Sequence, residues 1–227
     1  MLDLMSLACF VATVACYWGV KRIYLRNRKW WCTPIFAVPL LLIAAVLLVG
    51  IPYPTYFQDT RWLSWLLGPA TVAFAVPIYE HRALIRRHWL SLCCGVAVGM
   101  PAAVISSVWL ARWLDLPEAL QKSLAPRSIS TPFAIATADS IGASSDLTAV
   151  FVVITGVCGM LMGEAMLAWL PVRSRLARGA LFGAAAHGAG TAKAQQIGAE
   201  EGVVSSLVMM LGGVATVFAA PLIGWFV

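Results

Sequence analysis

Residues 147–170 read LTAVFVVITGVCGMLMGEAMLAWL, an apolar run that contains one charged residue, Glu164. About 20 residues of helix cross the hydrocarbon core of a bilayer, so this run is long enough to span a membrane. Apolar runs of comparable length occupy residues 2–20, 33–49, 89–114 and 203–227. These five runs predict an all-α polytopic membrane protein.

The composition agrees with a chain that is embedded in lipid. It is 61% hydrophobic and 11% charged, whereas about 25% of the residues of a soluble domain are charged. No Pro- or Ser-rich linker divides the sequence, which predicts a single integral membrane domain over residues 1–227. We expect two N-terminal spans within 1–60 and a core with broken segments within 61–227.

Three further apolar segments are interrupted by residues that break helices. They are 62–79, broken at Gly68 and Pro69; 125–143, broken at Pro126, Pro132 and Gly142; and 176–198, broken at Gly188 and Gly190.

Basic residues gather in short loops, and cytoplasmic loops of membrane proteins retain Lys and Arg. This topology explains the net charge of +6 better than nucleic-acid binding does. The three basic loops contain Lys21, Arg22, Arg26, Arg28 and Lys29; Arg82, Arg86 and Arg87; and Arg173, Arg175 and Arg178.

With these three loops inside, the N-terminus faces outside and segment 62–79 crosses once. Segment 125–143 then enters from outside and leaves on the same side, and segment 176–198 dips in from the cytoplasm. We therefore expect about six membrane-crossing helices and two opposed re-entrant or broken helical hairpins. The alternative is that one broken segment is an ordinary kinked span.

The outer segment 125–143 contains a cation and hydroxyl groups next to its helix breakers. A helix that begins at Pro132 would direct its free N–H groups and positive dipole end toward the turn, where an anion is stabilised. Inverted-repeat transporters bind substrate where two such segments meet at mid-membrane. The candidate substrate-binding residues here are Arg127, Ser128, Ser130 and Thr131.

The inner segment 176–198 offers a matching polar turn. Its candidate substrate-binding residues are His187, Gly188, Gly190, Thr191 and Lys193. His187 could also take up a coupling proton, because its unperturbed pKa of ~6.5 is near physiological pH. The alternatives are that His187 makes a structural hydrogen bond and that Lys193 extends to the cytoplasmic surface.

The acidic residues provide two further candidates for a proton or coupling-ion site, Glu164 and Asp139. Glu164 could equally pair with Arg173 or Arg175. Asp146 is expected to cap the next helix, and Glu200 and Glu201 to form a solvated helix start. No GxSxG, HExxH or GxGxxG pattern is present, and the six cysteines form no CxxC pair, so we expect no enzyme activity, no cofactor and no metal site.

Four segments also resemble the CidB/LrgB family of bacterial membrane proteins. They are LGPATVAFAVPIY at 67–79, RSISTP at 127–132, LTAVF at 147–151 and HGAGTAKA at 187–194. The likeness is colinear from about Leu67 onward, and the first two spans resemble the family only in hydropathy. Arg127 stands where the family typically has Lys, which keeps the charge but changes the hydrogen-bond geometry.

This resemblance implies two different functions. Plant relatives are plastidial glycolate/glycerate translocators, which implies a secondary transporter of small monocarboxylates such as glycolate, glycerate, pyruvate or lactate in the bacterial inner membrane. The family is also described as holin- and antiholin-like modulators of murein hydrolase activity and autolysis. That alternative implies a small CidA/LrgA-type membrane partner. We further expect a homodimer.

Overall fold

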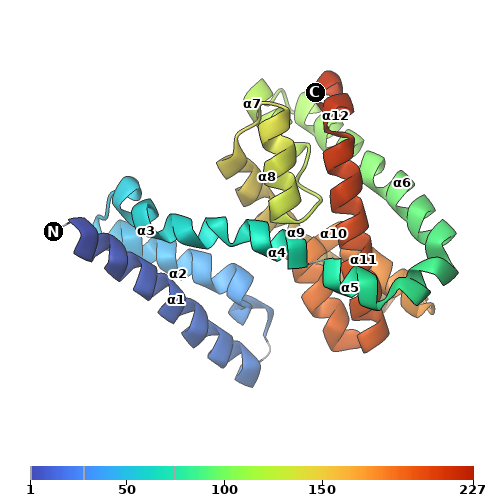
Figure 1. Cartoon of the computed structure of the whole chain (residues 1–227), viewed down its shortest axis with the longest axis horizontal. Coiled ribbons are helices and arrows are strands. Elements are labelled where there is room, and N and C mark those ends of the chain that lie inside the picture. Colours follow the sequence, from blue (N-terminus) through green and yellow to red (C-terminus); the bar gives the residue numbers. More distant parts are fainter. Residues whose placement is uncertain (1, 28, 74) are drawn as a thin grey trace. The chain divides into compact units, whose positions relative to one another are not determined.

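The structure is a computed structural model that describes residues 2–27, 29–73 and 75–227. Every regular element in these ranges is helical, which confirms the predicted all-α class (Figure 1). The helices in chain order are α1 (Leu2–Asn27), the 3-10 helix η1 (Trp30–Cys32), α2 (Pro34–Val49), α3 (Tyr53–Trp65), α4 (Leu67–Ala73), α5 (Ala75–Glu80), α6 (Arg82–Trp113), α7 (Glu118–Leu124), α8 (Thr131–Ser140), α9 (Ser145–Trp169), α10 (Arg175–Ile197), α11 (Ala199–Phe218) and α12 (Ala220–Phe226).

Within the described residues, four helical stretches are long and apolar enough to cross a bilayer: 4–27 of α1, α6, α9 and α11. The shorter apolar helix α2 corresponds to the predicted span 33–49. Large apolar side chains such as Leu48 and Trp169 are 88% and 90% exposed. Broad apolar exposure of this kind is typical of a surface that lipid or a protein partner covers.

Two of the predicted span boundaries differ from the structure. The loop expected around Arg82 and Arg87 is helical, because α6 begins at Arg82 and departs from helical geometry only at His88 (φ −118°, ψ 21°). The last predicted span is two helices, α11 and α12, and Pro221 lies in the first turn of α12.

The predicted kinked span 62–79 is divided among the end of α3, α4 and α5. Gly68 and Pro69 lie in the first turn of α4, and the interruption precedes them at Leu66. Residue 74, between α4 and α5, lies outside the described residues.

The chain divides into two compact units, Met1–Ala70 and Thr71–Val227. In the first unit, α1 packs against α2 and α3. The contact with α3 is partly polar: Ser6 Oγ donates to Asp59 (2.8 Å), and the Thr13 and Tyr56 hydroxyls lie 3.1 Å apart. Hydrogen bonds of this kind connect helices that have no hydrophobic driving force for association in lipid.

In the second unit, α7, the turn at 125–130 and α8 form what we call the outer hairpin (Figure 1). Ile129, in the turn, packs in a core cluster with α6 residues 92–100. Ile141, just after α8, packs instead with α6 residues 104–108 and with Ile223. The chain therefore runs from the end of α6 back toward its middle and then returns; that segment 125–143 enters and leaves the membrane on one side stays a prediction.

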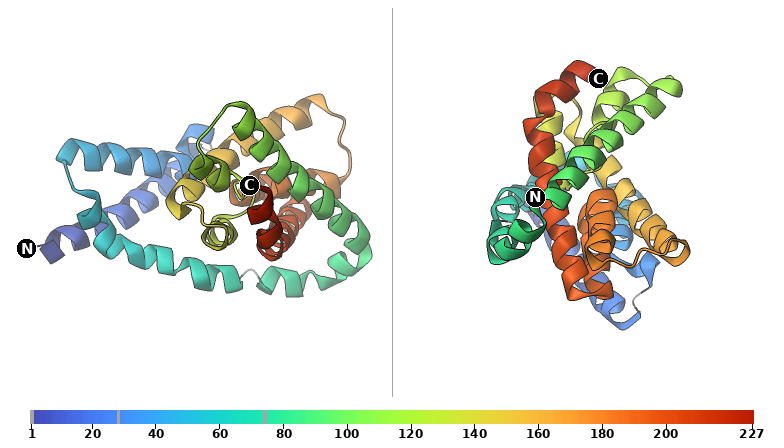
Figure 2. Two further views of the ribbon diagram at one scale, coloured as in Figure 1. Left: turned by 90° about the horizontal axis from the view of Figure 1, so that it is seen from above. Right: turned by 90° about the vertical axis from the view of Figure 1, so that its right-hand side faces the viewer.

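Helix α10 is itself a hairpin, which we call the inner hairpin. It changes direction at His187 (φ 35°, ψ −118°) rather than at the glycines that follow. Gly190 lies directly against the backbone carbonyl of Phe182, although residues eight apart in a straight helix are about 12 Å apart. Its second half then packs beside α11, where the Thr191 and Ser205 hydroxyls lie 3.0 Å apart (Figure 2).

We expect Gly190→Ala to destabilise the protein by about 1–3 kcal/mol, because the added methyl group would press on the Phe182 carbonyl and on Ala186. Thermal unfolding in detergent measures the effect. Gly188→Ala is the matched control, since nothing lies within 4 Å of a Cβ there. Equal melting temperatures for the two variants would contradict the tight reversal.

The outer hairpin also predicts the accessibility of its two ends. Glu118→Cys and Ser140→Cys, each on a background without the six native cysteines, should react with a membrane-impermeant thiol reagent from the same side of the membrane. Ser130→Cys should react slowly, because Ser130 is buried. Labelling of the two ends from opposite sides would show that the segment crosses the membrane.

Candidate functional site

The turn of the outer hairpin is held by the side chain of Arg127. Its Nε donates a hydrogen bond to Ser107 Oγ of α6 (2.7 Å), and its Nη1 donates to Thr155 Oγ1 of α9 (3.4 Å). Among the residues that the structure describes, none accepts a hydrogen bond from Nη2. The guanidinium is therefore fixed in place and still has donor capacity for a ligand.

The turn of the inner hairpin contacts α9 at Gly156, the residue after Thr155. A Cβ on Gly156 would lie 2.8 Å from Cε1 of His187, so the imidazole packs directly on the α9 backbone. Both predicted polar turns thus converge on Thr155 and Gly156.

Two buried polar atoms lack a hydrogen-bond partner within the described part of the chain, Ser130 Oγ and His187 Nε2. Their residues are 6% and 3% exposed. An unsatisfied buried donor or acceptor costs about 1–3 kcal/mol, so native proteins rarely leave one without a ligand or water. One such atom belongs to each hairpin turn, so each turn presents a polar group to a candidate ligand site.

The start of α8 adds backbone donors to this site. Ser130 is the N-cap residue of α8, but its hydroxyl makes no capping bond. The first turn of a helix carries N–H groups without intrahelical partners, and these groups favour anions. Thr131, half-buried, is the first residue of that turn, and Ser128 lies buried just before it.

The structure engages other predicted residues in packing. Thr191 pairs with Ser205, and Gly190 contacts Phe182. Gly188, by contrast, is exposed and takes no part in this packing. Thr191 and Gly190 shape the inner hairpin rather than present free polar groups at its turn.

The acidic candidates lie away from the two turns. Glu164 pairs with Lys193 (2.8 Å) and not with Arg173 or Arg175. Asp139 is exposed near the end of α8, where it accepts a hydrogen bond from Ser145.

The helix-start assignments of three other acidic residues are partly wrong. The N-cap of α9 is Ser144, whose Oγ accepts from the Leu147 N–H, and not Asp146. Glu200 is exposed and pairs with Arg175 (3.2 Å), but Glu201 is buried. Only Glu200 therefore forms a solvated helix start.

Sequence reasoning missed Ser107, Thr155 and Gly156. Each lies inside a long apolar run, and the apolar pattern there predicts only a membrane span. The available signal was chemical: a hydroxyl within a lipid-embedded helix needs a partner, and that partner can be a functional residue.

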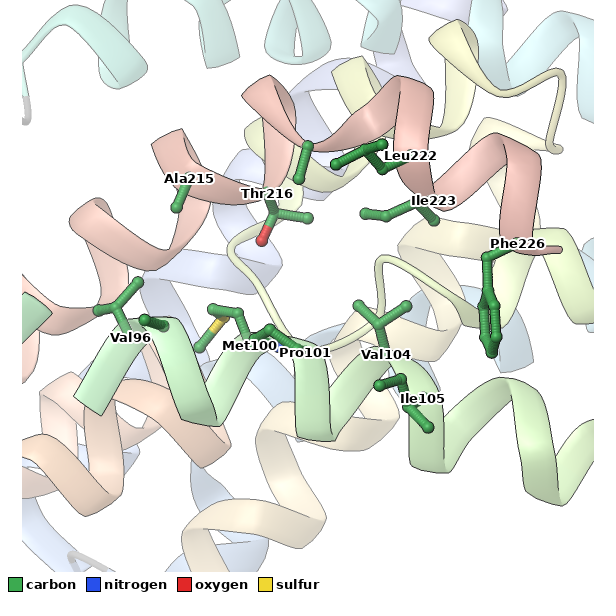
Figure 3. A pocket seen from close by; sticks show the side chains of 12 residues that line it. Val96, Met100, Pro101, Val104, Ile105, Ala215, Thr216, Leu222, Ile223 and Phe226 are labelled. Carbon is green, nitrogen blue, oxygen red and sulfur yellow. The ribbon is translucent and has the colours of Figure 1, made fainter. Parts of the chain in front are cut away.

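Two hollows flank the helices of the second unit. A cleft of about 750 Å³ lies along α9 and includes Arg127 and Ser128 in its lining. A groove of about 350 Å³ between α6 and α11–α12 is lined by side chains such as Met100 and Phe226, and Thr216 is the polar residue among them (Figure 3). The cleft, and not the groove, adjoins the polar turns.

Comparison with known proteins identifies the family. Residues 13–226 match the model of the LrgB-like family. The chain belongs to the LrgB-like family. The match includes most of α1 and all of α2, so the family likeness extends well before Leu67, where the sequence resemblance began. With its long apolar helices, this LrgB-like chain is a membrane protein.

Two Bacillus subtilis (strain 168) proteins are similar over nearly their whole length. The uncharacterized protein YwbG is 38% identical over 209 residues, which cover 92% of this chain and 93% of YwbG. The uncharacterized protein YxaC is 34% identical over 220 residues, which cover 97% of this chain and 96% of YxaC. No solved structure matches the chain.

Ser107→Ala should destabilise the protein by about 1–3 kcal/mol, because it removes the acceptor for a half-buried charged donor. Thermal unfolding in detergent measures this loss. Ser106→Ala is the matched control, since the neighbouring exposed hydroxyl bonds only the Ala103 carbonyl (3.1 Å). Identical stability of the two variants would contradict the anchoring role of Ser107.

Proposed function

We propose that this LrgB-like protein is a secondary transporter of small monocarboxylates, such as glycolate, glycerate, pyruvate or lactate, in the bacterial inner membrane. The observation that carries the proposal is the pair of buried polar atoms without a partner among the described residues, Ser130 Oγ and His187 Nε2, on the two hairpin turns that contact α9 at Thr155 and Gly156. Arg127 provides a fixed positive charge beside them.

A carboxylate fits the donors of this site. Ser130 Oγ–H, Arg127 Nη2 and the first N–H groups of α8 can all donate to its oxygens. His187 Nε2 can donate to the carboxylate when it carries the proton, or accept from a 2-hydroxyl group when it does not. One guanidinium balances one negative charge, so a dicarboxylate would leave an uncompensated charge at membrane depth.

The hairpins supply the means of alternating access. Transporters built from opposed broken helices expose a central site to one side and then the other by moving one element against the rest. His187 is the best-placed proton acceptor, because Glu164 is paired with Lys193 and Asp139 lies at the far end of α8. A homodimer and a small CidA/LrgA-like partner stay predictions.

The proposal predicts that Ser130→Ala and His187→Ala each lower the uptake of labelled glycolate or pyruvate into proteoliposomes at least about tenfold. A hydrogen bond to a charged group contributes about 1.5–3 kcal/mol, and each 1.4 kcal/mol is a factor of ten in binding. Gel filtration in detergent would establish that both variants are folded.

Ser206→Ala is the control, because that hydroxyl bonds only the Val203 carbonyl of its own helix (2.8 Å). Its uptake should equal that of the unmodified protein. Normal uptake in both site variants would contradict the assignment. Leakage of many unrelated solutes that ignores these substitutions would instead support the holin-like alternative, which requires no buried polar site.

A further inference from the structure

The cleft along α9 extends much further than a small carboxylate requires. Its floor follows α9 from Phe151 to Met166, and its walls come from α6 and from the first half of α10. At 1.5 Å per residue, that stretch of α9 rises about 22 Å. This exceeds the half-thickness, about 15 Å, of a bilayer's hydrocarbon core.

The lining of the cleft changes in character from one end to the other. Arg127, Ser128 and Thr155 line its polar part, which lies near the end where Phe151 and Ile154 also line the cleft. The remainder of α9 within the cleft, from Gly159 to Met166, contributes methionine and glycine, and α10 adds Leu181 and two alanines. Glu164 in this stretch is absent from the lining. The cleft therefore matches a ligand with an anionic head and a long apolar tail.

The depth of the polar part restricts the source of such a ligand. Arg127 belongs to the outer turn, and its guanidinium donates to Thr155, which lies near the middle of α9 (Ser145–Trp169). A phospholipid phosphate is tied through glycerol to the membrane surface. The carboxylate of a single-chain fatty acid carries no such tether.

We infer that this cleft binds a long-chain fatty carboxylate from the bilayer, with its head group on Arg127 and its alkyl chain along α9. The charge of the guanidinium complements the carboxylate, and the methionine-lined floor adapts to a flexible chain. This inference goes beyond the proposed transport of small acids. Because both ligands use Arg127, the long-chain acid excludes the small one.

The native thiol of Cys158 provides a direct test. It lines the cleft, is exposed, and lies three residues after Thr155. The protein, with its other five cysteines replaced, is placed in dioleoylphosphatidylcholine nanodiscs and labelled with a maleimide. Palmitate should slow labelling at least about fivefold, whereas acetate and hexadecanol at the same concentration should not.

Substitutions locate the ligand. Met162→Trp fills the apolar end of the cleft and should abolish protection by palmitate, as should Arg127→Gln in the polar part. Met162 is 64% exposed, so its replacement does not require the fold to change. Val214→Trp, on an exposed position of α11 outside the cleft, should keep full protection.

Several outcomes would overturn the inference. If acetate or hexadecanol protected Cys158 as well as palmitate does, the cleft would not recognise both the carboxylate and the alkyl chain. Protection in phosphatidylglycerol nanodiscs without palmitate would assign the cleft to a phospholipid. Efficient Cys158–Cys158 cross-linking that palmitate leaves unchanged would assign it to a second copy of the chain. Labelling requires no transport, so this test and the uptake test fail independently.

Discussion

The hydrogen bonds of the Arg127 guanidinium connect the outer turn, α6 and α9, and the rest of the second unit is built around these three elements. Arg127 joins the outer turn to Ser107 of α6 and to Thr155 of α9, and the residue after Thr155 supports the imidazole of the inner turn. A charged side chain at membrane depth is costly unless it is paired or hydrogen-bonded. The need to satisfy this cation therefore ties the outer turn to α9, while the absence of a side chain at Gly156 lets the inner turn approach the same helix.

Backbone that is not helical survives within a bilayer only where protein or a polar hollow covers it. The outer turn meets this requirement in two ways. Pro126 is fully buried, and both it and Pro132 lack an N–H group, so fewer backbone donors need partners. The donors that remain, at the start of α8, lie next to Ser130, whose hydroxyl is itself unbonded. Covering the turn and keeping its polar groups available are thus achieved by the same few residues.

Much of this architecture could be predicted from the sequence, because apolar length and helix breakers act locally. The apolar run at 147–170 is α9 almost to the residue, and Pro132 does lie in the first turn of α8. Long-range pairings could not be predicted. Nothing in the sequence couples Glu164 to Lys193, 29 residues later, or distinguishes Thr155 from any other hydroxyl in a span. The sequence predicts the inner reversal at Gly188 and Gly190, but in the structure it lies at His187, the residue before them.

The reversal at His187 has a cost in backbone strain, and the imidazole that it brings to the site offers a reason for that cost. His187 has a φ of 35°, a conformation that glycine adopts freely and that other residues adopt only when their surroundings enforce it, at about 1–3 kcal/mol. A glycine at this position would make the same bend without steric penalty but would bring no ring nitrogen. The bend at His187 is thus strained, and a rearrangement that let this residue relax toward ordinary helical angles would release that local strain. His187 would then contact the ligand through its imidazole and, through its strained backbone, favour that rearrangement.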